Sequence, residues 1–256
     1  MNTPRRRRPA ARALALASMA AVLAAGAAGV AAAEPDITGV WGHAFPRPGV
    51  TPDPRLLPPP PGDPELTPAY AEDYRKLREA ERASDRAGQP LANASTQCLP
   101  DGMPQMMFAI YPLEILQTKG QVTMIEEAYS QVRRVYLDKP QLAIDDVPPG
   151  YFGHSVGHWE GDVLVVDTVG VKEQVKGFKD LPHSDQMHIE ERLQLLTPDI
   201  LQDQVTIVDP KALVKPWSFT FAYQRVRNYE MLEYVCENNR EYVDQNGVTQ
   251  VRLGGK

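Results

Sequence analysis

The sequence predicts an all-β protein: an antiparallel up-and-down β-barrel with a proline-rich N-terminal arm and one external helix. Short segments that alternate apolar and polar residues recur from residue 113 onward, and turn-forming sequences separate them. A meander of consecutive hairpins closes into a barrel because closure removes its unpaired edges. The chain contains neither a glycine-rich phosphate loop nor a dinucleotide-binding fingerprint, which argues against a nucleotide-binding α/β fold.

Residues 1–33 are predicted to be a secretory signal peptide. Their first twelve residues include five arginines and no acid, and an apolar run follows up to Ala33. The run ends in Ala31-Ala32-Ala33, a small-x-small cleavage pattern. A transmembrane anchor is the alternative interpretation, and the arginines leave a twin-arginine export route open. We therefore expect a periplasmic or secreted protein.

The mature chain is acidic and is expected to form one domain. The full sequence has 256 residues with 27 basic and 33 acidic side chains, and the leader holds five of the basic ones, which leaves a net charge of −11. This charge argues against a nucleic-acid partner. No later apolar run is long enough to span a membrane. We assign residues 34–112 to a first strand, arm and helix, and residues 113–256, together with 34–42, to the barrel.

The N-terminal part supplies one strand, the arm and the helix. Asp36–Trp41 is expected to be a short strand. Ten prolines lie between Phe45 and Pro68, a composition that favours an extended arm outside any sheet interior. A helix is predicted from Pro68 to just before Gly88, with Thr67 as its N-cap. Its apolar residues are sparse, so we expect it on the outside.

The barrel strands follow from the alternating pattern and the turns. Lys119-Gly120 and Glu160-Gly161-Asp162 are hairpin turns between alternating segments. The expected strands are Leu113–Thr118, Gln121–Ile125, Tyr129–Leu137, Tyr151–Trp159, Val163–Val169, Met187–Leu196, Gln202–Val208, Trp217–Arg225 and Tyr229–Glu237.

The two cysteines, Cys98 and Cys236, are predicted to form a disulfide bond. An even cysteine count in an exported protein favours a structural bridge, here between the N-terminal extension and the last expected strand. A loop of this length makes such a bridge worth about 3–5 kcal/mol. A free-thiol catalytic role is the weaker alternative, because neither cysteine has a histidine nearby in sequence.

Histidines supply the candidate catalytic residues, since four of the five lie between residues 154 and 188. A two-residue turn at Glu160-Gly161 would place His154 opposite Asp167, with His158 on the same face. A three-residue loop would instead place His154 opposite Thr168. His154 is therefore a candidate general acid or base oriented by Asp167. The alternative is a histidine bonded to a backbone carbonyl or facing solvent.

A second candidate group lies on the next strand. His188, Glu190 and Arg192 share one face of it. If that face points inward, His188 is a candidate catalytic residue and Arg192 a ligand-binding residue for a carboxylate or oxyanion. If it points outward, these residues are solvated surface. His183 lies in a loop, where it is a ligand-binding candidate at the barrel mouth.

Aromatic residues complete the candidate site. Tyr151 and Trp159, together with His158, are candidates to line a pocket for an aromatic or apolar ligand. The histidines lack the His-x-His spacing of zinc sites, so no metal site and no cofactor are predicted, with zinc kept as the alternative. Glu126 and Glu127 lie at the end of an expected strand, where an acid can be either a functional group or an ordinary strand residue.

Gly39-Val-Trp41, at the start of the expected meander, resembles the Gly-x-Trp opening of lipocalin-type barrels. The resemblance implies that Trp41 closes the barrel floor and packs against a basic residue of the last strands. Arg225 or Arg227 would be that residue, as a cation–π partner.

A longer segment, Gly153-His-Ser-Val-Gly-His-Trp-Glu-Gly-Asp-Val-Leu-Val-Val-Asp-Thr168, resembles the signature of a large family of exported bacterial proteins without an assigned function. The resemblance covers about residues 37–240 and implies a fold and a compartment, but no catalytic residues. Further similar segments are Cys98–Pro104, Pro182–Ser184, His188–Arg192, Asp209-Pro210 with Pro216-Trp217, and Glu233–Asn238.

Three functions remain open from the sequence. The first is an exported lipocalin-like protein that binds a small apolar or aromatic molecule in the barrel lumen. The alternative is a cofactor-independent acid–base enzyme, an isomerase, hydratase or lyase, that uses a pocket of His154, Asp167, His188 and Arg192. The third is an interaction module whose acidic surface or proline arm binds another, unknown protein.

Overall fold

A computed structural model describes residues 34–43, 49, 51–89, 91, 94, 97–108 and 110–236, and the backbone of two short strands beyond them. These strands are β10 (Glu241–Val243) and β11 (Thr249–Val251). Residues 34–256 form one compact unit. The predicted signal peptide, residues 1–33, lies outside the described residues.

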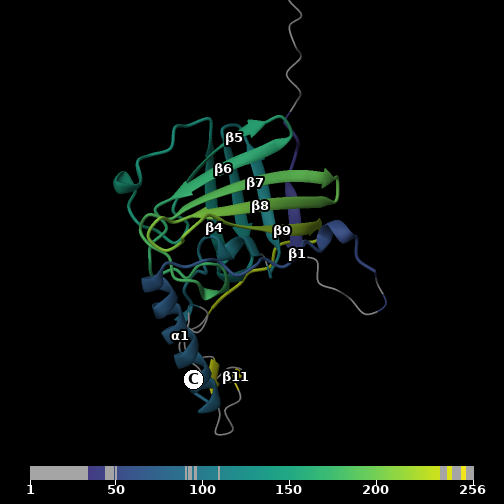
Figure 1. Cartoon of the computed structure of the whole chain (residues 1–256). Coiled ribbons are helices and arrows are strands. Elements are labelled where there is room, and N and C mark those ends of the chain that lie inside the picture. Colours follow the sequence, from purple (N-terminus) through teal and green to yellow (C-terminus); the bar gives the residue numbers. More distant parts are fainter. Residues whose placement is uncertain are drawn as a thin grey trace, which may run out of the picture. The chain divides into compact units, whose positions relative to one another are not determined.

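Nine strands of the described chain form a closed β-barrel (Figure 1). The barrel closes because the N-terminal strand pairs with both its neighbours, β2 and β9. The predicted all-β barrel is therefore confirmed. Its strands are β1 (Gly39–His43), β2 (Leu113–Thr118), β3 (Gln121–Glu126), β4 (Gln131–Leu137), β5 (His154–Glu160), β6 (Val163–Val169), β7 (His188–Thr197), β8 (Ile200–Val208) and β9 (Trp217–Arg225).

One strand pair departs from a pure meander. Strands β4 and β5 pair in parallel, whereas every other neighbouring pair in the barrel is antiparallel. A parallel pair requires a connection that returns the chain to the same end of the sheet. Residues 138–153 make this return, and Gln141 within them donates to the carbonyl oxygens of His154 and Asp167 at 3.3 and 2.9 Å.

The expected last strand, Tyr229–Glu237, is not a strand where the structure describes it. Residues 229–236 leave the barrel as a tail that Glu127 anchors. The Tyr229 hydroxyl and the Leu232 amide both donate to one Glu127 carboxylate oxygen, at 2.7 and 2.9 Å. The tail ends in the predicted disulfide, which joins Cys236 to Cys98. Strand β1 takes the ninth place in the barrel instead.

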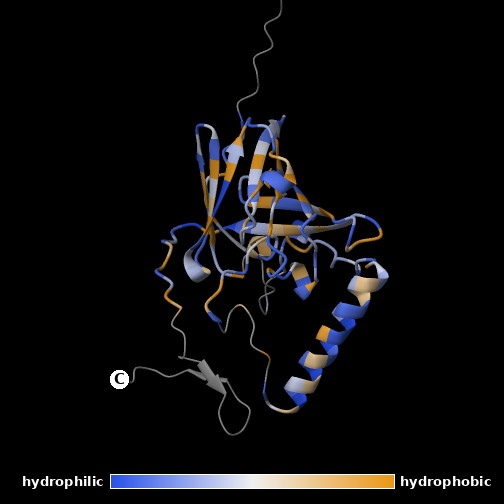
Figure 2. Ribbon diagram, turned by 90° about the vertical axis from the view of Figure 1, so that its left-hand side faces the viewer, coloured by the Kyte–Doolittle hydropathy of each residue, from blue (hydrophilic) through white to orange (hydrophobic). Residues whose placement is uncertain are grey.

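The single long helix, α1 (Pro68–Arg86), agrees with its prediction. None of its described residues is buried, and Figure 2 colours many of its residues as hydrophilic. Thr67 precedes the helix but does not cap it through its side chain, because its hydroxyl donates to the Lys211 carbonyl at 2.8 Å. This bond and a bridge between Leu66 and Leu213 attach the N-terminal arm to the barrel.

Trp41 and Arg225 form the floor contact that the lipocalin resemblance implies. The buried Trp41 ring lies under the Arg225 guanidinium, 4.1 Å from its central carbon to the ring centroid. Arg225 also donates to the carbonyls of Thr38 and Pro198, at 2.5 and 2.8 Å. Arg227 instead pairs with Asp199. Arg225 is therefore the cation–π partner.

Candidate ligand-binding site

Three of the candidate histidines, His154, His158 and His188, lie on the outer face of the barrel, on strands β5 and β7. Their inner face carries the alternate residues, because side chains alternate along a strand. In the β5–β6 hairpin Glu160 pairs with Val163, so His154 faces Val169 and neither expected register occurs. His154, His158 and Asp167 nevertheless share a face, as predicted.

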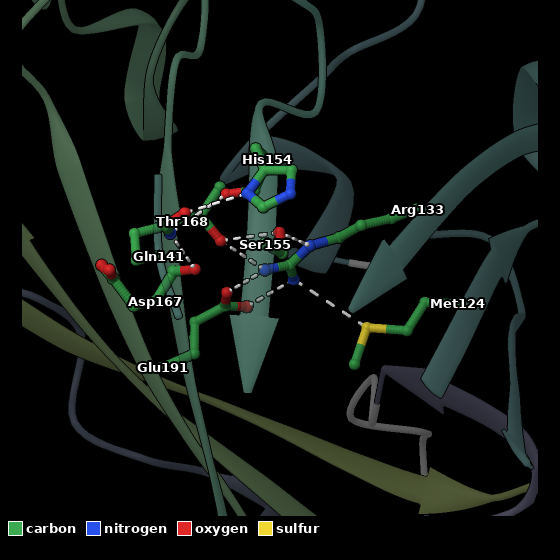
Figure 3. Close-up of polar contacts among 8 residues, drawn as sticks. All are labelled: Met124, Arg133, Gln141, His154, Ser155, Asp167, Thr168 and Glu191. Carbon is green, nitrogen blue, oxygen red and sulfur yellow. Dashed lines mark hydrogen bonds and ion pairs between the residues drawn. The ribbon is translucent and has the colours of Figure 1, made fainter. Parts of the chain in front are cut away.

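On that outer face, Asp167 pairs with His188 rather than with His154. The Nδ1 atom of His188 lies 3.2 Å from Oδ1 of Asp167, and both side chains are more than a third exposed. His154 stacks on Tyr136, and its Nδ1 lies 2.9 Å from Oε1 of Gln141 (Figure 3). The inward orientation considered for His188 and Arg192 is therefore wrong.

The other exposed residues of this face pair among themselves. Glu160 accepts from Arg192 at 2.8 Å and lies 3.2 Å from Nε2 of His158. A groove of about 280 Å³ lies between these strands and the chain after β4. It is lined by Asp138, Lys139, Val156, Gly157, His158, Val165 and Asp167.

His183 is held by backbone carbonyl groups and also lines the small cavity beside Phe178 and Trp217. Its side chain is buried, Nε2 lies 2.6 Å from the Val175 carbonyl oxygen, and Nδ1 lies 3.0 Å from that of Ser184. Ser184 in turn donates its amide and hydroxyl to Asp209, both at 2.6 Å. The segments around residues 183 and 209, far apart in sequence, are therefore joined by structural hydrogen bonds.

Tyr151 and Trp159 are only partly buried and pack against the core. The Lys172 ammonium lies 3.4 Å from the Tyr151 ring centroid, a cation–π contact between two partly buried residues. The indole N–H of Trp159 is buried without a hydrogen-bond partner in the described part of the protein. Neither residue lines a cavity that the described residues define around the candidate histidines.

The inner face of the same strands carries a polar cluster that the sequence analysis missed. Arg133 of β4, 1% exposed, binds both carboxylate oxygens of Glu191 on β7, which is 0% exposed (Figure 3). Arg133 also donates to the hydroxyls of Ser155 and Thr168, at 3.2 and 2.9 Å. Each of these three partners is a neighbour in sequence of a residue that was singled out.

Asp203 of β8 completes this cluster. It is fully buried, and neither carboxylate oxygen has a hydrogen-bond donor among the described residues. Burial and the nearby Glu191 carboxylate raise the pKa of Asp203 well above its usual range, against a smaller opposing effect of Arg133. A proton on Asp203 lets it donate to Glu191.

Glu126 forms a separate buried acid at the end of β3. Burial, and to a smaller degree Asp101, raise the pKa of Glu126 to about 9. Gln131 donates to Glu126 at 2.5 Å, and its amide oxygen accepts from the Gly102 backbone at 3.2 Å. Glu126 and Glu127 therefore fix chain segments at this end of the barrel.

Aromatic rings gather inside the barrel beside the cluster of Arg133, Glu191 and Asp203, because Phe221 pairs with Asp203 across the strands. Phe178 lies 4.9 Å from Phe219 and 5.2 Å from Phe221, and Trp217 lies 4.7 Å from Phe219, between ring centroids. A cavity of about 20 Å³, room for about one water molecule, adjoins them. It is lined by the apolar residues Leu66, Phe178, Leu181, Pro182, Met187, Ile207, Ala212, Leu213 and Trp217, by Gly177, and by the polar residues His183 and Asp209.

Phe178 differs from the other rings because it comes from a loop. Gly177–Leu181, termed the lid segment below, includes a 3-10 turn in which Lys179 and Asp180 have φ of 60° and 58°. Exposed contacts hold this segment from outside. Tyr74 of α1 donates to the Lys179 carbonyl at 3.3 Å, and the Lys179 ammonium donates to the Pro61 carbonyl at 3.3 Å.

Comparisons with protein-family models, curated proteins and solved structures find no match. Within the described ranges, no group of three or more histidine, cysteine or acidic side chains is arranged to hold a metal ion. No helix in the same ranges is both long and apolar enough to cross a membrane.

Proposed function

We propose that the protein is an exported, lipocalin-like barrel that binds a small apolar or aromatic molecule. The proposed site is the cluster of Phe178, Trp217, Phe219 and Phe221, termed the aromatic end below. The observation that carries this proposal is the position of Phe178. This ring fills the barrel interior against Phe219 and Phe221, yet it belongs to a loop rather than to a barrel strand. Leu181 of the same loop is also buried, and Tyr74 of α1 holds the loop from outside through one exposed hydrogen bond. A ligand ring can take the same place when the lid segment moves.

The packing of the barrel supports a site that opens on binding. The side chains of Trp41, Met124, Leu193 and Tyr223 are 0% exposed, so none of them borders a void that a water molecule can enter. In the part of the barrel that these described side chains fill, ligand space must therefore come from a displaced side chain. Withdrawing Phe178 forfeits about 1.5–3 kcal/mol of burial, and an aromatic ligand that replaces it recovers a similar amount.

The proposed compartment rests on the leader and on the disulfide. Disulfide bonds form and persist in the periplasm and outside cells, which agrees with the bond between Cys98 and Cys236. The arginine-rich leader pattern of residues 1–33 and the resemblance to exported bacterial proteins support the same compartment.

A binding titration with Nile red tests the proposal. Mature, disulfide-bonded protein should bind the dye saturably and change the fluorescence of Trp217, which contacts Phe178 and Phe219. Phe219→Ala should weaken binding, because it removes one wall of the site. Leu142→Ala, at an exposed position outside the barrel interior, is the matched control. Equal dye signals for the wild type, both variants and an unrelated barrel would rule the site out.

A second candidate function is acid–base catalysis at the outer groove. The observation in its favour is the His188–Asp167 pair, since Asp167 also lines the groove. The probe is deuterium exchange of the α-protons of cyclohexanone in D2O, followed by NMR. Catalysis at this site predicts exchange that His188→Gln abolishes and His183→Gln spares. Exchange at the rate of protein-free buffer would exclude this chemistry for that probe class.

A further inference from the structure

We infer that the ligand is an amine with an aromatic or apolar body, and that Asp203 is the counter-ion of its ammonium group. The inference rests on the proposed function and names the ligand class of that same site. Three observations carry it: the position of Asp203, the charged groups around it, and the absence of a free N–H donor on the neighbouring Arg133.

Asp203 is the cross-strand neighbour of Phe221, one of the rings of the aromatic end. On the inner face of the barrel its cross-strand neighbours are Leu193 on β7 and Phe221 on β9. The Phe221 ring contacts Phe178 edge-on at 5.2 Å. One ring therefore separates the displaceable Phe178 from the Asp203 carboxyl group, so a ligand body in place of Phe178 brings a short side arm to Asp203.

The neighbouring cation has no donor to offer Asp203. An arginine side chain has five N–H donors. In Arg133, Nε donates to Ser155, Nη1 to Glu191 and to the Met124 sulfur, and Nη2 to Thr168 and to Glu191. All five donors are therefore committed, and the Arg133 charge is matched by Glu191.

The remaining groups that face Asp203 do not compensate its charge either. Glu191 on β7 is an anion, and Tyr223 on β9 donates its hydroxyl to the Met107 carbonyl at 2.5 Å. Glu126 on β3 lies near Tyr223 in the same interior, and it is an acid, so it supplies no positive charge either. An ionised Asp203 would be a buried, unpaired charge, which is strongly unfavourable. Without a ligand, Asp203 therefore keeps its proton.

An arriving ammonium group changes this balance without changing the net charge of the cluster. The ammonium ion enters, Asp203 releases its proton to solvent, and the resulting carboxylate accepts a charge-assisted hydrogen bond from the ligand nitrogen. The faces of the surrounding aromatic rings attract a cation as well. A neutral hydroxyl group gains only one ordinary hydrogen bond, so amines should bind more tightly than alcohols of the same shape.

Three probes of one shape test the inference by calorimetry: 2-phenylethylamine, 2-phenylethanol and 3-phenylpropanoate. With wild-type protein the amine should bind about tenfold more tightly than the alcohol, the difference expected between a charge-assisted and an ordinary hydrogen bond, and the carboxylate should bind most weakly. Amine binding should release about one proton, measured as the dependence of the binding heat on the ionisation heat of the buffer.

Asp203→Asn should abolish both the amine preference and the proton release. This variant has the shape and neutrality of the protonated acid, so we expect it to fold. The matched control is Asp185→Asn, which makes the same change at an exposed carboxylate paired with Lys211. It should leave the amine preference intact.

The outcomes separate this inference from the proposed function. If the alcohol binds as tightly as the amine, or if the amine preference survives in Asp203→Asn, the inference is wrong and the proposed function stands. If none of the probes and no Nile red bind to wild type or to Phe178→Ala, the proposed function fails as well. The proton-release measurement uses wild-type protein alone, so it decides the matter even if Asp203→Asn does not fold.

Discussion

Arg133 and Glu191, on strands β4 and β7, form an ion pair inside the barrel in which both side chains are shielded from solvent. The pair spans the barrel interior and is extended by Ser155, Thr168 and the buried Asp203, whose pKa burial raises. A buried pair of this kind adds little net stability when it is intact, but removal of one partner leaves an uncompensated charge.

Glu191→Ala should therefore destabilise the protein strongly. We expect a loss of about 3–5 kcal/mol in the free energy of unfolding, because Arg133 remains buried without its anion. Urea denaturation gives this value. Glu190→Ala, at the next position on the exposed face of β7, should change it by less than about 0.5 kcal/mol. Equal costs for the two variants would contradict the prediction.

Stability should fall as pH rises from about 4.5 to about 9, because Glu126 titrates in the unfolded chain near 4.5 and in the folded protein at about 9. Below pH 4.5 Glu126 carries its proton in both the folded and the unfolded protein, so its ionisation does not affect the free energy of unfolding. Above this pH, folding requires Glu126 to regain its proton, so the free energy of unfolding decreases until about pH 9. Asp203, whose pKa is also raised, adds to the same trend.

Glu126→Gln should flatten this profile, because the amide is neutral at every pH and still accepts from Gln131. Urea midpoints between pH 5 and pH 9 measure the effect, with the exposed Glu190→Gln as control. A difference between the wild-type and Glu126→Gln midpoints that does not change with pH would show that Glu126 is ionised in the folded protein.

Opening the disulfide should free the C-terminal tail and destabilise the protein. Cys98 and Cys236 are 138 residues apart, and closing a loop of that size contributes about 3–5 kcal/mol. Reduction should lower the melting temperature of wild-type protein and leave that of the Cys98→Ser/Cys236→Ser variant unchanged. Two free thiols in oxidised, natively exported protein would refute the predicted bond.

Gly39→Ala should disturb the barrel floor. Gly39 has φ of +140°, and a Cβ atom there would lie 2.3 Å from Nη1 of Arg225. We expect a cost of about 1–3 kcal/mol from the strained backbone and the displaced guanidinium. Gly62→Ala, where nothing lies within 4 Å of the new methyl group, is the control. The cost should shrink in an Arg225→Ala background, because the two residues are in contact.

Tyr74→Phe should speed ligand entry by loosening the lid segment. The variant removes the hydrogen bond from α1 to the Lys179 carbonyl and keeps the ring. We expect Nile red to associate about two- to tenfold faster, consistent with a bond worth about 0.5–1.5 kcal/mol. Arg75→Gln, which removes only ion pairs within the helix, should not change the rate. Stopped-flow fluorescence measures both.

Much of the architecture was predictable because it is encoded locally. Strands β2, β6 and β9 match their predicted bounds, since alternating side chains and turn residues act over a few positions. The segment after Tyr229 was assigned wrongly as a strand. Its tyrosine and valine residues are compatible with a strand, but Glu127 and the disulfide draw it away from the sheet.

The site was harder to predict because a strand pattern does not say which face points inward. His154, His188 and Arg192 are the candidates that residue chemistry favours, whereas the interior carries their neighbours Ser155 and Glu191. A signal was present: the apolar residues Leu164 and Val166 share a face with Thr168, and Ile189 and Leu193 share one with Glu191. Following the apolar face would have pointed to these inner polar residues.

The sequence by itself determined the all-β class, the helix, the approximate bounds of the barrel strands and the cysteine pairing. The class, the helix and the strands depend on local patterns, and with two cysteines there is one possible pair. Only the tertiary structure decided the register of the β5–β6 hairpin, the parallel pairing of β4 with β5 and the meeting of Arg133 with Glu191 and Asp203. These depend on contacts between strands distant in the chain, where barrel closure selects the inner face and burial determines which charges must be paired.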